Sequence, residues 1–145
     1  MIPAFPIAAK ELLPQRPPFL FVDRLLSYDG EEVRTAFTVP QEGILIENGR
    51  LQASGLLEHM AQSSAARVGF ISKYVLEIPI RIGFIGAIRS GKIYRLPLAG
   101  ETIETTISSV REIGGVTMVD AIVRSGDEII AEANLKSAMG QEAQQ

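Results

Sequence analysis

The chain has 145 residues, 46% of them apolar and 21% charged, which is enough to bury one core, and we expect a single domain over residues 1–145. A formal net charge of −3 and the absence of Trp argue against nucleic-acid binding, because phosphate recognition needs an excess of Lys and Arg with aromatic platforms. The lack of Cys excludes disulfides and thiolate chemistry, so reactivity is left to carboxylates, hydroxyls, amides or the single His59.

The first third of the chain is expected to hold a short helix and a β-hairpin. One or two helical turns over residues 8–13 should end at Pro14 and the Pro17–Pro18 pair. A strand over residues 19–27 should then turn at Asp29-Gly30 into a second strand over residues 31–39. The second strand alternates between Val33, Thr35, Phe37 and Val39 on one face and Arg34 and Thr38 on the other, which is typical of a half-buried strand.

One long helix is expected over residues 51–73, after a loop over residues 40–50 that holds the apolar run Ile44–Ile46. The segment has no proline, and apolar or small residues occur almost all round its helical wheel. A helix that is apolar on nearly every side is typically a buried helix. Other elements must therefore surround it.

The rest of the chain supplies strands, which are expected over residues 80–88, 92–96, 101–111, 116–125 and 128–139. Both faces of the segment 116–123 are apolar, which predicts a place in mid-sheet or under a second subunit. The last strand should alternate, with Ile129, Ala131, Ala133 and Leu135 on one face and the polar residues 132, 134 and 136 on the other. A polar, frayed tail should follow over about 140–145. This order predicts an α+β fold in which an antiparallel sheet wraps round one long central helix.

The expected helix carries a polar group of residues in apolar surroundings. Glu58 and Gln62 are four residues apart and share a face, with Ser54 one turn earlier. A desolvated carboxylate there would have a raised pKa, suited to proton transfer near neutrality. The alternatives are that Glu58 is a surface residue or is paired with Arg50 or Arg67.

His59 is adjacent to Glu58, but neighbouring helical residues point about 100° apart. Glu58 and His59 of one chain are therefore not expected to contact the same substrate atom. A lone helical His is most often a core or interface residue, and a catalytic role across a dimer interface is the alternative.

No cofactor or metal is expected. The glycines at 83, 86 and 91 do not match a dinucleotide-binding or Walker loop, and one His with scattered carboxylates gives no metal-ligand spacing. The N-terminus lacks a signal-peptide pattern, and no segment has 18 uninterrupted apolar residues. We therefore expect a cytoplasmic protein with no membrane span.

Two segments resemble the 3-hydroxyacyl-[acyl-carrier-protein] dehydratases. Residues 12–24, Leu-Leu-Pro-Gln-Arg-Pro-Pro-Phe-Leu-Phe-Val-Asp-Arg, are similar to the signature that opens these enzymes. Residues 55–62, Gly-Leu-Leu-Glu-His-Met-Ala-Gln, are similar to their catalytic helix. Residues 84–88, 94–97 and 100–101 agree more loosely, so that the resemblance spans roughly residues 12–136.

This resemblance implies a hotdog fold, a dimer with active sites at the subunit interface, and acyl thioesters delivered by an acyl carrier protein. In the family a His removes the Cα proton, the helical Glu protonates the departing 3-hydroxyl, and amides at the helix start polarise the thioester carbonyl. Carried over to this chain, Glu58 matches the acid, and Ser54, Gly55, Gln62 and Gln15 are the expected substrate-binding residues.

The chain departs from the family pattern at the proton acceptor. The loop over residues 41–50 has no His-Phe-Pro-Gly motif, and Gln15 stands where the opening signature has a His. The shortened loop resembles a divergent branch associated with aryl polyene gene clusters. Either His59 has an unusual catalytic role, or the usual base is missing.

Three hypotheses follow, and all share one fold. The first is a dehydratase-like protein acting on 3-hydroxyacyl-carrier-protein thioesters in fatty-acid or polyketide-type synthesis. The second is an acyl thioesterase, and the third is a non-catalytic acyl-binding subunit or heterodimer partner. Expected partners are an acyl carrier protein or acyl-CoA, and a second hotdog subunit, identical or related. The basic residues are either the candidate docking patch for the carrier protein or a solvated strand face: Arg81, Arg89, Lys92 and Arg95.

Overall fold

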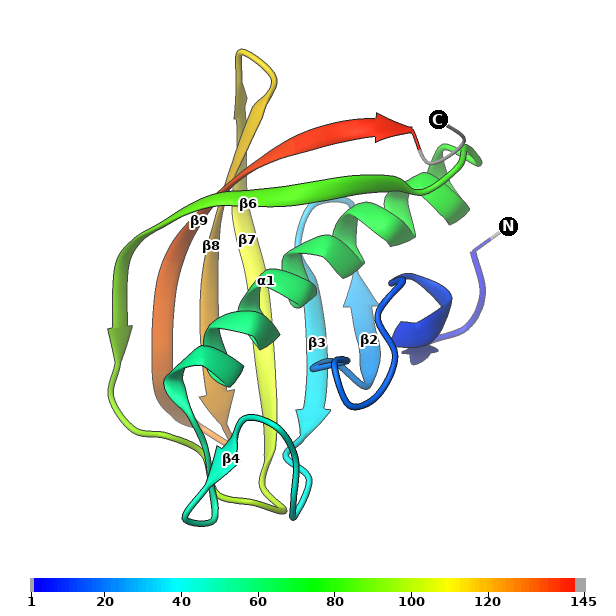
Figure 1. Cartoon of the computed structure of the whole chain (residues 1–145). Helices are drawn as coiled ribbons and strands as arrows, with labels where there is room; N and C mark the ends of the chain where they lie inside the picture. Colours follow the sequence, from blue (N-terminus) through cyan, green and yellow to red (C-terminus); the bar gives the residue numbers. More distant parts are fainter. Residues whose placement is uncertain (1, 143–145) are drawn as a thin grey trace.

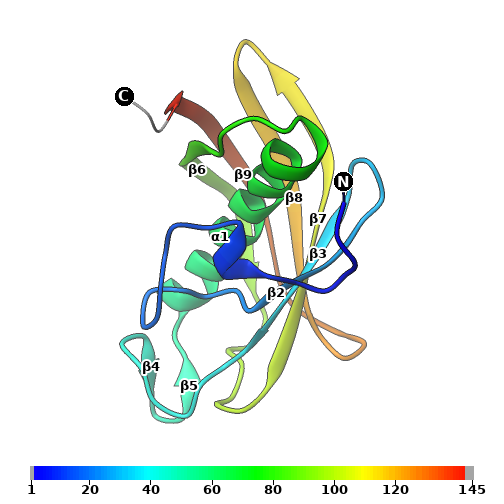
Figure 2. The same cartoon turned by 90° about the vertical axis from the view of Figure 1, so that its right-hand side faces the viewer.

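An antiparallel sheet of seven strands curls round one helix in the structure, a computed structural model that describes residues 2–142, with the side chains of 81–86 and 139–142 left out of the description. The helix α1 (Ala53–Phe70) crosses the concave face of the sheet (Figures 1 and 2). This is the expected α+β hotdog architecture. The strands of the sheet, in chain order, are β1 (Ile7–Ala8), β2 (Arg24–Tyr28), β3 (Val33–Thr38), β6 (Arg81–Ile93), β7 (Thr102–Ile113), β8 (Val116–Ser125) and β9 (Glu128–Glu142).

The spatial order of the strands is β1-β2-β3-β7-β8-β9-β6. The doubly apolar strand β8 lies between β7 and β9, which confirms its expected place in mid-sheet. Strand β6 is an edge: over the described residues its 13 residues pair with β9 alone. A second, two-stranded sheet, β4 (Ile46–Glu47) with β5 (Arg50–Leu51), precedes the helix.

The helix is shorter than expected at its start and changes form at its end. It begins at Ala53 and continues after Phe70 into a π-helical turn, η2 (Ile71–Val75). Phe70 is fully buried and packs against the rings of Phe5, Tyr28 and Tyr74. No helix among the described residues is long and apolar enough to span a membrane.

The N-terminal part differs from the expectation in detail. Within residues 8–13, Ala8 ends β1, and a short 3₁₀ helix, η1 (Ala9–Glu11), follows it directly. Residues 19–23 were expected to belong to a strand, but they precede β2 without regular secondary structure, as a segment here called the strap. The strap runs beside α1, and helix side chains bind its backbone at Phe19 and Phe21.

The C-terminal strands correct three further expectations. The two strands expected over residues 80–96 form one strand, β6, and residues 94–96 fall outside it. A register shift between β8 and β9 at Arg124 turns Ile130 into the core and leaves Ile129 39% exposed. The expectation that Ile129 shares a face with the buried Ala131 is therefore wrong. The expected frayed tail is wrong over residues 140–142, which belong to β9, and residues 143–145 lie outside the described part.

Candidate active site

Glu58 lies on the exposed side of α1, where its Oε1 accepts a hydrogen bond from Nε2 of Gln62 at 2.9 Å. The two expected alternative partners are engaged elsewhere: Arg50 donates to the Leu96 carbonyl and Arg67 to the Glu31 carbonyl. The sequence predicted a desolvated carboxylate, and this is wrong for the single chain. Glu58 would become buried only under a second molecule.

Gln62 holds Glu58 from a buried position, with 2% of its surface exposed. Its Oε1 accepts the Phe21 N–H at 2.7 Å, and its Nε2 donates to the Phe19 carbonyl at 2.9 Å as well as to Glu58. These bonds use both amide hydrogens and the amide oxygen, so the orientation of the carboxamide is fixed. Gln62 therefore positions the carboxylate and leaves no donor of its own for a substrate.

His59 is completely buried, and both of its ring nitrogens are bonded inside the chain. Nδ1 lies 2.7 Å from the Phe21 carbonyl, which accepts its hydrogen, and Nε2 lies 2.7 Å from the Thr105 hydroxyl. Burial lowers the pKa of His59 to about 4, against a smaller raising effect of the hydrogen bond to Phe21. This geometry is that of a core residue, with no ring nitrogen free for a substrate.

Phe21 is the point at which these two helix residues meet the strap. Its N–H is bonded to Gln62 and its carbonyl to His59, which are three residues apart on α1. The side chains thus replace the hydrogen bonds that a neighbouring strand would give. The strap is held against the helix in the one position that also orients Glu58 through Gln62.

The start of α1 lies next to a cavity of about 350 Å³ lined by Ser54, Gln52, Glu47 and the run Ile44–Ile46. Leu56 makes the first helical hydrogen bond, to the Gln52 carbonyl, and the Gln52 side chain does not cap the helix. By helix geometry, the amides of residues 53–55 precede that bond and point toward the helix start. Ser54 is exposed there, whereas Gly55 is buried, and a Cβ at Gly55 would collide with the Leu51 side chain.

Gln15 lies in the loop that leads into the strap and is half-buried. Its Oε1 is buried and has no hydrogen-bond partner. A buried oxygen without a donor costs about 1–3 kcal/mol, and such groups are retained where a further molecule supplies the donor or where a fold carries strain.

The candidate basic patch is smaller than the sequence suggested. Arg95 is bonded to Glu101 through two hydrogen bonds, of 2.9 and 2.6 Å, and to Glu128 at 3.1 Å. The Arg95 guanidinium holds the pKa of Glu101 at about 2, so the pair is charged at neutral pH. Arg89 and Lys92 are exposed, and the side chain of Arg81 lies outside the described residues.

No group of three or more His, Asp or Glu residues in the described part is arranged to hold a metal ion. The site is therefore built from one exposed carboxylate, its carboxamide support and the free amides of a helix start.

The chain is similar in sequence to a family of dehydratases. Residues 7–145 match the model of the ApeP-like family, described as ApeP dehydratase. The 3-hydroxyacyl-[acyl-carrier-protein] dehydratase FabZ of Anaeromyxobacter dehalogenans (strain 2CP-C) is 24% identical over 139 residues, covering 92% of this chain and 88% of that protein. FabZ of Symbiobacterium thermophilum is 28% identical over 135 residues, covering 89% and 92%.

Solved structures agree on the fold. The structure titled "The Dehydratase Heterocomplex ApeI:P from Xenorhabdus doucetiae" superposes with a TM-score of 0.82 at 15% identity, covering 93% of this chain and 92% of that one. A hypothetical thioesterase with coenzyme A from Streptococcus pneumoniae gives 0.63 at 11% identity, covering 81% and 85%. The fold is therefore that of the hotdog proteins. The chain belongs to the ApeP-like dehydratase family.

Proposed function

We propose that this chain supplies the helical acid of a dehydratase site for 3-hydroxyacyl-carrier-protein thioesters, and that a different hotdog subunit completes the site with the proton acceptor. The observation that carries the proposal is the pairing of an exposed, oriented Glu58 with a buried, fully bonded His59. The proposed acid lies at the surface, where a substrate can reach it. The one imidazole of the chain is buried and has no ring nitrogen available to a substrate.

The reaction needs two proton-transfer groups. A base removes the Cα proton while Glu58 donates a proton to the departing 3-hydroxyl, so that water leaves and a double bond forms between C2 and C3. The amides at the start of α1 would hold the thioester carbonyl as negative charge develops on its oxygen. Gln62 would fix the direction in which Glu58 delivers its proton.

A second copy of this chain is a poor source of the base. Each copy has one His, which is buried with both ring nitrogens bonded, and no Cys. A related subunit with an accessible His meets the requirement. The free edge of β6 supports association with a second subunit. The similarity to a structure titled as a dehydratase heterocomplex supports an unlike one.

The test is a complementation assay with a 3-hydroxyacyl-carrier-protein substrate, followed by mass spectrometry. The partner is a His-containing hotdog dehydratase subunit from the same source, with its own helical Glu changed to Gln so that it is inactive alone. Mixing it with this chain should restore loss of water, and mixing it with Glu58→Gln should not. Enoyl product from this chain alone at the same rate would refute the need for a partner.

The same assay separates the remaining hypotheses. Release of free acid that depends on Glu58 would indicate a thioesterase. Binding of the acyl-carrier protein without turnover in any mixture would indicate a non-catalytic subunit.

A further inference from the structure

His59 is a buried titratable residue with no direct part in the proposed reaction. Its ring lies among apolar side chains: it stacks on Phe37, whose ring also lies against that of Phe21 with centroids 5.8 Å apart. A polar side chain in such surroundings costs free energy unless its hydrogen bonds are made. The two hydrogen bonds of the imidazole therefore indicate what the residue contributes.

The two partners of the imidazole fix which nitrogen carries the hydrogen. The Phe21 carbonyl can only accept, so Nδ1 donates the 2.7 Å bond to the strap. The ring is neutral near neutral pH and has one N–H, so Nε2 accepts the bond from the Thr105 hydroxyl, also at 2.7 Å. Thr105 on β7 thus holds the ring, and the ring holds the Phe21 carbonyl toward the helix.

The Phe21 backbone in turn sets the orientation of the Gln62 carboxamide. Both of its polar groups point to the helix, the carbonyl to His59 and the N–H to Oε1 of Gln62. Because an N–H can only donate, the Gln62 oxygen must face the strap and its NH2 group must face Glu58. A rotated carboxamide would place its oxygen against the carboxylate and would lose the bonds to Phe19 and Phe21 as well.

This orientation selects one oxygen of Glu58 for proton transfer. Gln62 donates to Oε1 at 2.9 Å, so Oε1 is an acceptor and the proton of the acid form belongs on Oε2. Oε2 makes no hydrogen bond within the described residues. The oxygen that carries the proton is therefore the one that a substrate hydroxyl can reach.

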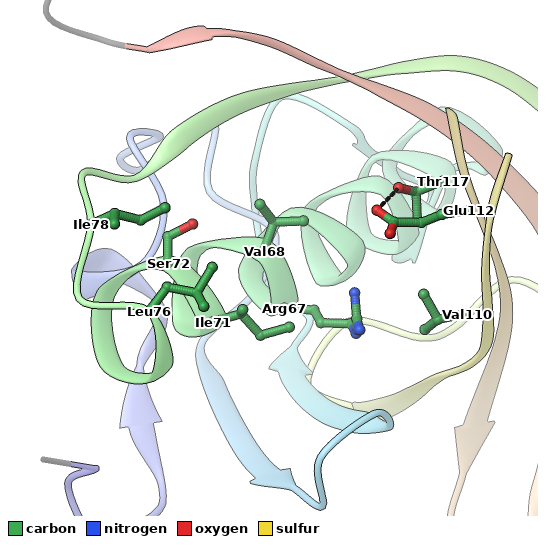
Figure 3. Close-up of a pocket in the computed structure, with 9 residues that line it drawn as sticks. All are labelled: Arg67, Val68, Ile71, Ser72, Leu76, Ile78, Val110, Glu112 and Thr117. Atoms are coloured by element: carbon green, nitrogen blue, oxygen red, sulfur yellow. Dashed lines mark hydrogen bonds between the residues drawn. The ribbon is translucent and has the colours of Figure 1, made fainter. Parts of the chain in front are cut away.

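The hydrogen bonds at the far end of α1 form a separate contact. Arg67 also donates from the helix to a main-chain carbonyl, that of Glu31, at 2.8 Å. It lies beside a cavity of about 400 Å³ and extends toward Val110, Glu112 and Thr117 (Figure 3). Glu31 also accepts the Val110 amide at a bulge of β7. This contact joins the helix to the turn before β3 and to β7, and it does not include the strap.

A buried hydroxyl pair gives a matched comparison for His59. Thr35 of β3 lies opposite Thr105 of β7 in the sheet, and its hydroxyl is bonded at 2.7 Å to that of Ser63, one helical turn after His59. This pair also joins the helix to the sheet inside the core, but it has no bond to the strap. Its loss should weaken the fold without turning Gln62.

We propose that His59 is a positioning residue for the proposed acid, Glu58. It holds the Phe21 backbone so that Gln62 presents its NH2 group to the carboxylate and leaves Oε2 to deliver the proton. Without the His59 bond the Phe21 carbonyl would turn toward another donor, because an unpaired buried acceptor costs free energy, and the Phe21 N–H would leave Gln62. The proposal rests on the proposed function in taking Glu58 as the acid of the dehydration.

Two substitutions of His59 keep different halves of its hydrogen bonding. Asn carries its amide nitrogen as many bonds from Cα as Nδ1, so His59→Asn can keep the strap bond and loses the bond to Thr105. Gln carries its amide at the position of Nε2, so His59→Gln can keep the bond to Thr105 and loses the strap bond. Both variants lose the ring that stacks on Phe37, so they differ chiefly in the bond to the strap.

The first readout is the exchange of the Gln62 side-chain amide hydrogens, followed by NMR on the nitrogen-labelled full chain. In the wild type both hydrogens are bonded, so they should exchange slowly and give two separate signals. His59→Asn and Thr35→Val should keep this protection. His59→Gln should raise the exchange rate by roughly tenfold or more, as expected for the loss of about one hydrogen bond.

The second readout is turnover in the complementation assay. His59→Gln should lower kcat by roughly 10- to 100-fold, because misplacing a catalytic group by about 1 Å has an effect of that size. Its KM should stay close to that of the wild type, because the lost orientation acts in the transition state. His59→Asn should rescue most of the wild-type kcat, and Thr35→Val should leave kcat unchanged.

Three results would overturn the proposal. The first is equal kcat and equal Gln62 protection in His59→Asn and His59→Gln, and the second is a fall of kcat in Thr35→Val as large as in His59→Gln. If His59→Gln does not fold, Thr105→Val is compared with His59→Asn, since both lack the Thr105 bond and keep the strap bond. Both should then keep kcat and Gln62 protection, and loss of either in both variants is the third result.

The two readouts also separate this proposal from the dehydratase proposal. If Gln62 protection follows the expected pattern and no water is lost in any mixture, the positioning of Gln62 by His59 stands and the dehydratase proposal fails. If water is lost at equal rates with the wild type, His59→Asn and His59→Gln, the dehydratase proposal stands and the assignment of His59 fails.

Discussion

Glu58 and His59 are neighbours in the sequence with opposite environments. The carboxylate is exposed and bonded to Gln62, whereas the imidazole is buried, stacks on Phe37 with ring centroids 5.7 Å apart, and binds Thr105. The helical period explains the difference, because adjacent side chains point about 100° apart. The sequence motif places Glu58 at the position of the family acid, and its role as the acid stays a prediction. The hydrogen bonds by which the strap holds Gln62, and through it Glu58, could not be predicted, because the strap and this part of the helix are about 40 residues apart in the sequence.

The Glu58→Gln and Gln62→Met variants should fail in different ways. Glu58→Gln removes the proposed proton donor, which is exposed, so turnover should fall by about 10²–10⁴-fold with little change in stability. Gln62→Met leaves the Phe21 amide and the Phe19 carbonyl without partners, so the free energy of unfolding should fall by about 2 kcal/mol along with turnover. Denaturant unfolding beside the complementation assay measures both. Equal stability of the two variants would contradict the positioning role of Gln62.

His59 should make the protein acid-sensitive in a defined pH range. Its pKa is about 4 in the folded state and 6.5 unfolded, so the unfolded chain binds the extra proton as the pH falls through that interval. The contribution of His59 to the free energy of unfolding should be fully present above pH 6.5. It should be lost as the pH falls toward 4, by roughly 3 kcal/mol in total.

The control for this prediction is His59→Leu. The variant should be less stable at pH 7, because Thr105 and the Phe21 carbonyl lose their partner. Its stability should not change between pH 6.5 and pH 5, above the range in which Glu101 titrates. The measurement is thermal unfolding of both proteins across this pH range. If the stability of His59→Leu changed with pH as that of the wild type does, the acid sensitivity would not come from His59.

At the scale of elements, the long helix, the hairpins and the mid-sheet place of β8 were predictable, because each depends on local periodicity and turn residues. The predictions of elements failed where tertiary contacts override the local sequence pattern. Residues 19–23 are apolar enough for a strand, yet Gln62 and His59 bind their backbone. The Ile129–Ile130 bulge, the β7 bulge pinned by Glu31 and the cavity beside Arg67 likewise depend on contacts that no local sequence pattern specifies.

The contact between α1 and the N-terminal segment can be tested at Gly69. A Cβ there would collide with the Leu12 backbone carbonyl, which has no flexible side chain to yield. Gly69→Ala should therefore lower the free energy of unfolding by about 1–3 kcal/mol, despite the better helix propensity of Ala. Gly91→Ala is the control, because its Cβ would make only ordinary contacts of 3.5 and 4.0 Å. Denaturant unfolding of the two variants should separate them, and equal stabilities would disprove close packing at Gly69.

At the scale of the whole molecule, the sheet is closed on neither side. Strand β1 has two residues, but β6 offers a 13-residue edge with the exposed side chains Ile88 and Ile93. The exposed Glu58 and the unpartnered Gln15 oxygen are the other features that a single chain leaves incomplete. All of them are consistent with a subunit that works in an assembly.

Association should depend on the β6 edge. Ile88→Lys places a charge on this edge strand and should prevent assembly with the proposed partner subunit, as judged by analytical ultracentrifugation of the mixture. Ile113→Lys, at the tip of the β7–β8 hairpin and 72% exposed in the wild type, is the matched control and should assemble normally. Assembly of the Ile88 variant with wild-type affinity would place the interface elsewhere.

The free β6 edge also bears on how the protein is produced. An edge strand with exposed apolar side chains is a template for other strands, so copies made without the proposed partner should aggregate through it. Balanced synthesis of the two chains would then protect solubility as well as activity. The yield of soluble protein should rise on co-expression with the partner and, for Ile88→Lys, without it.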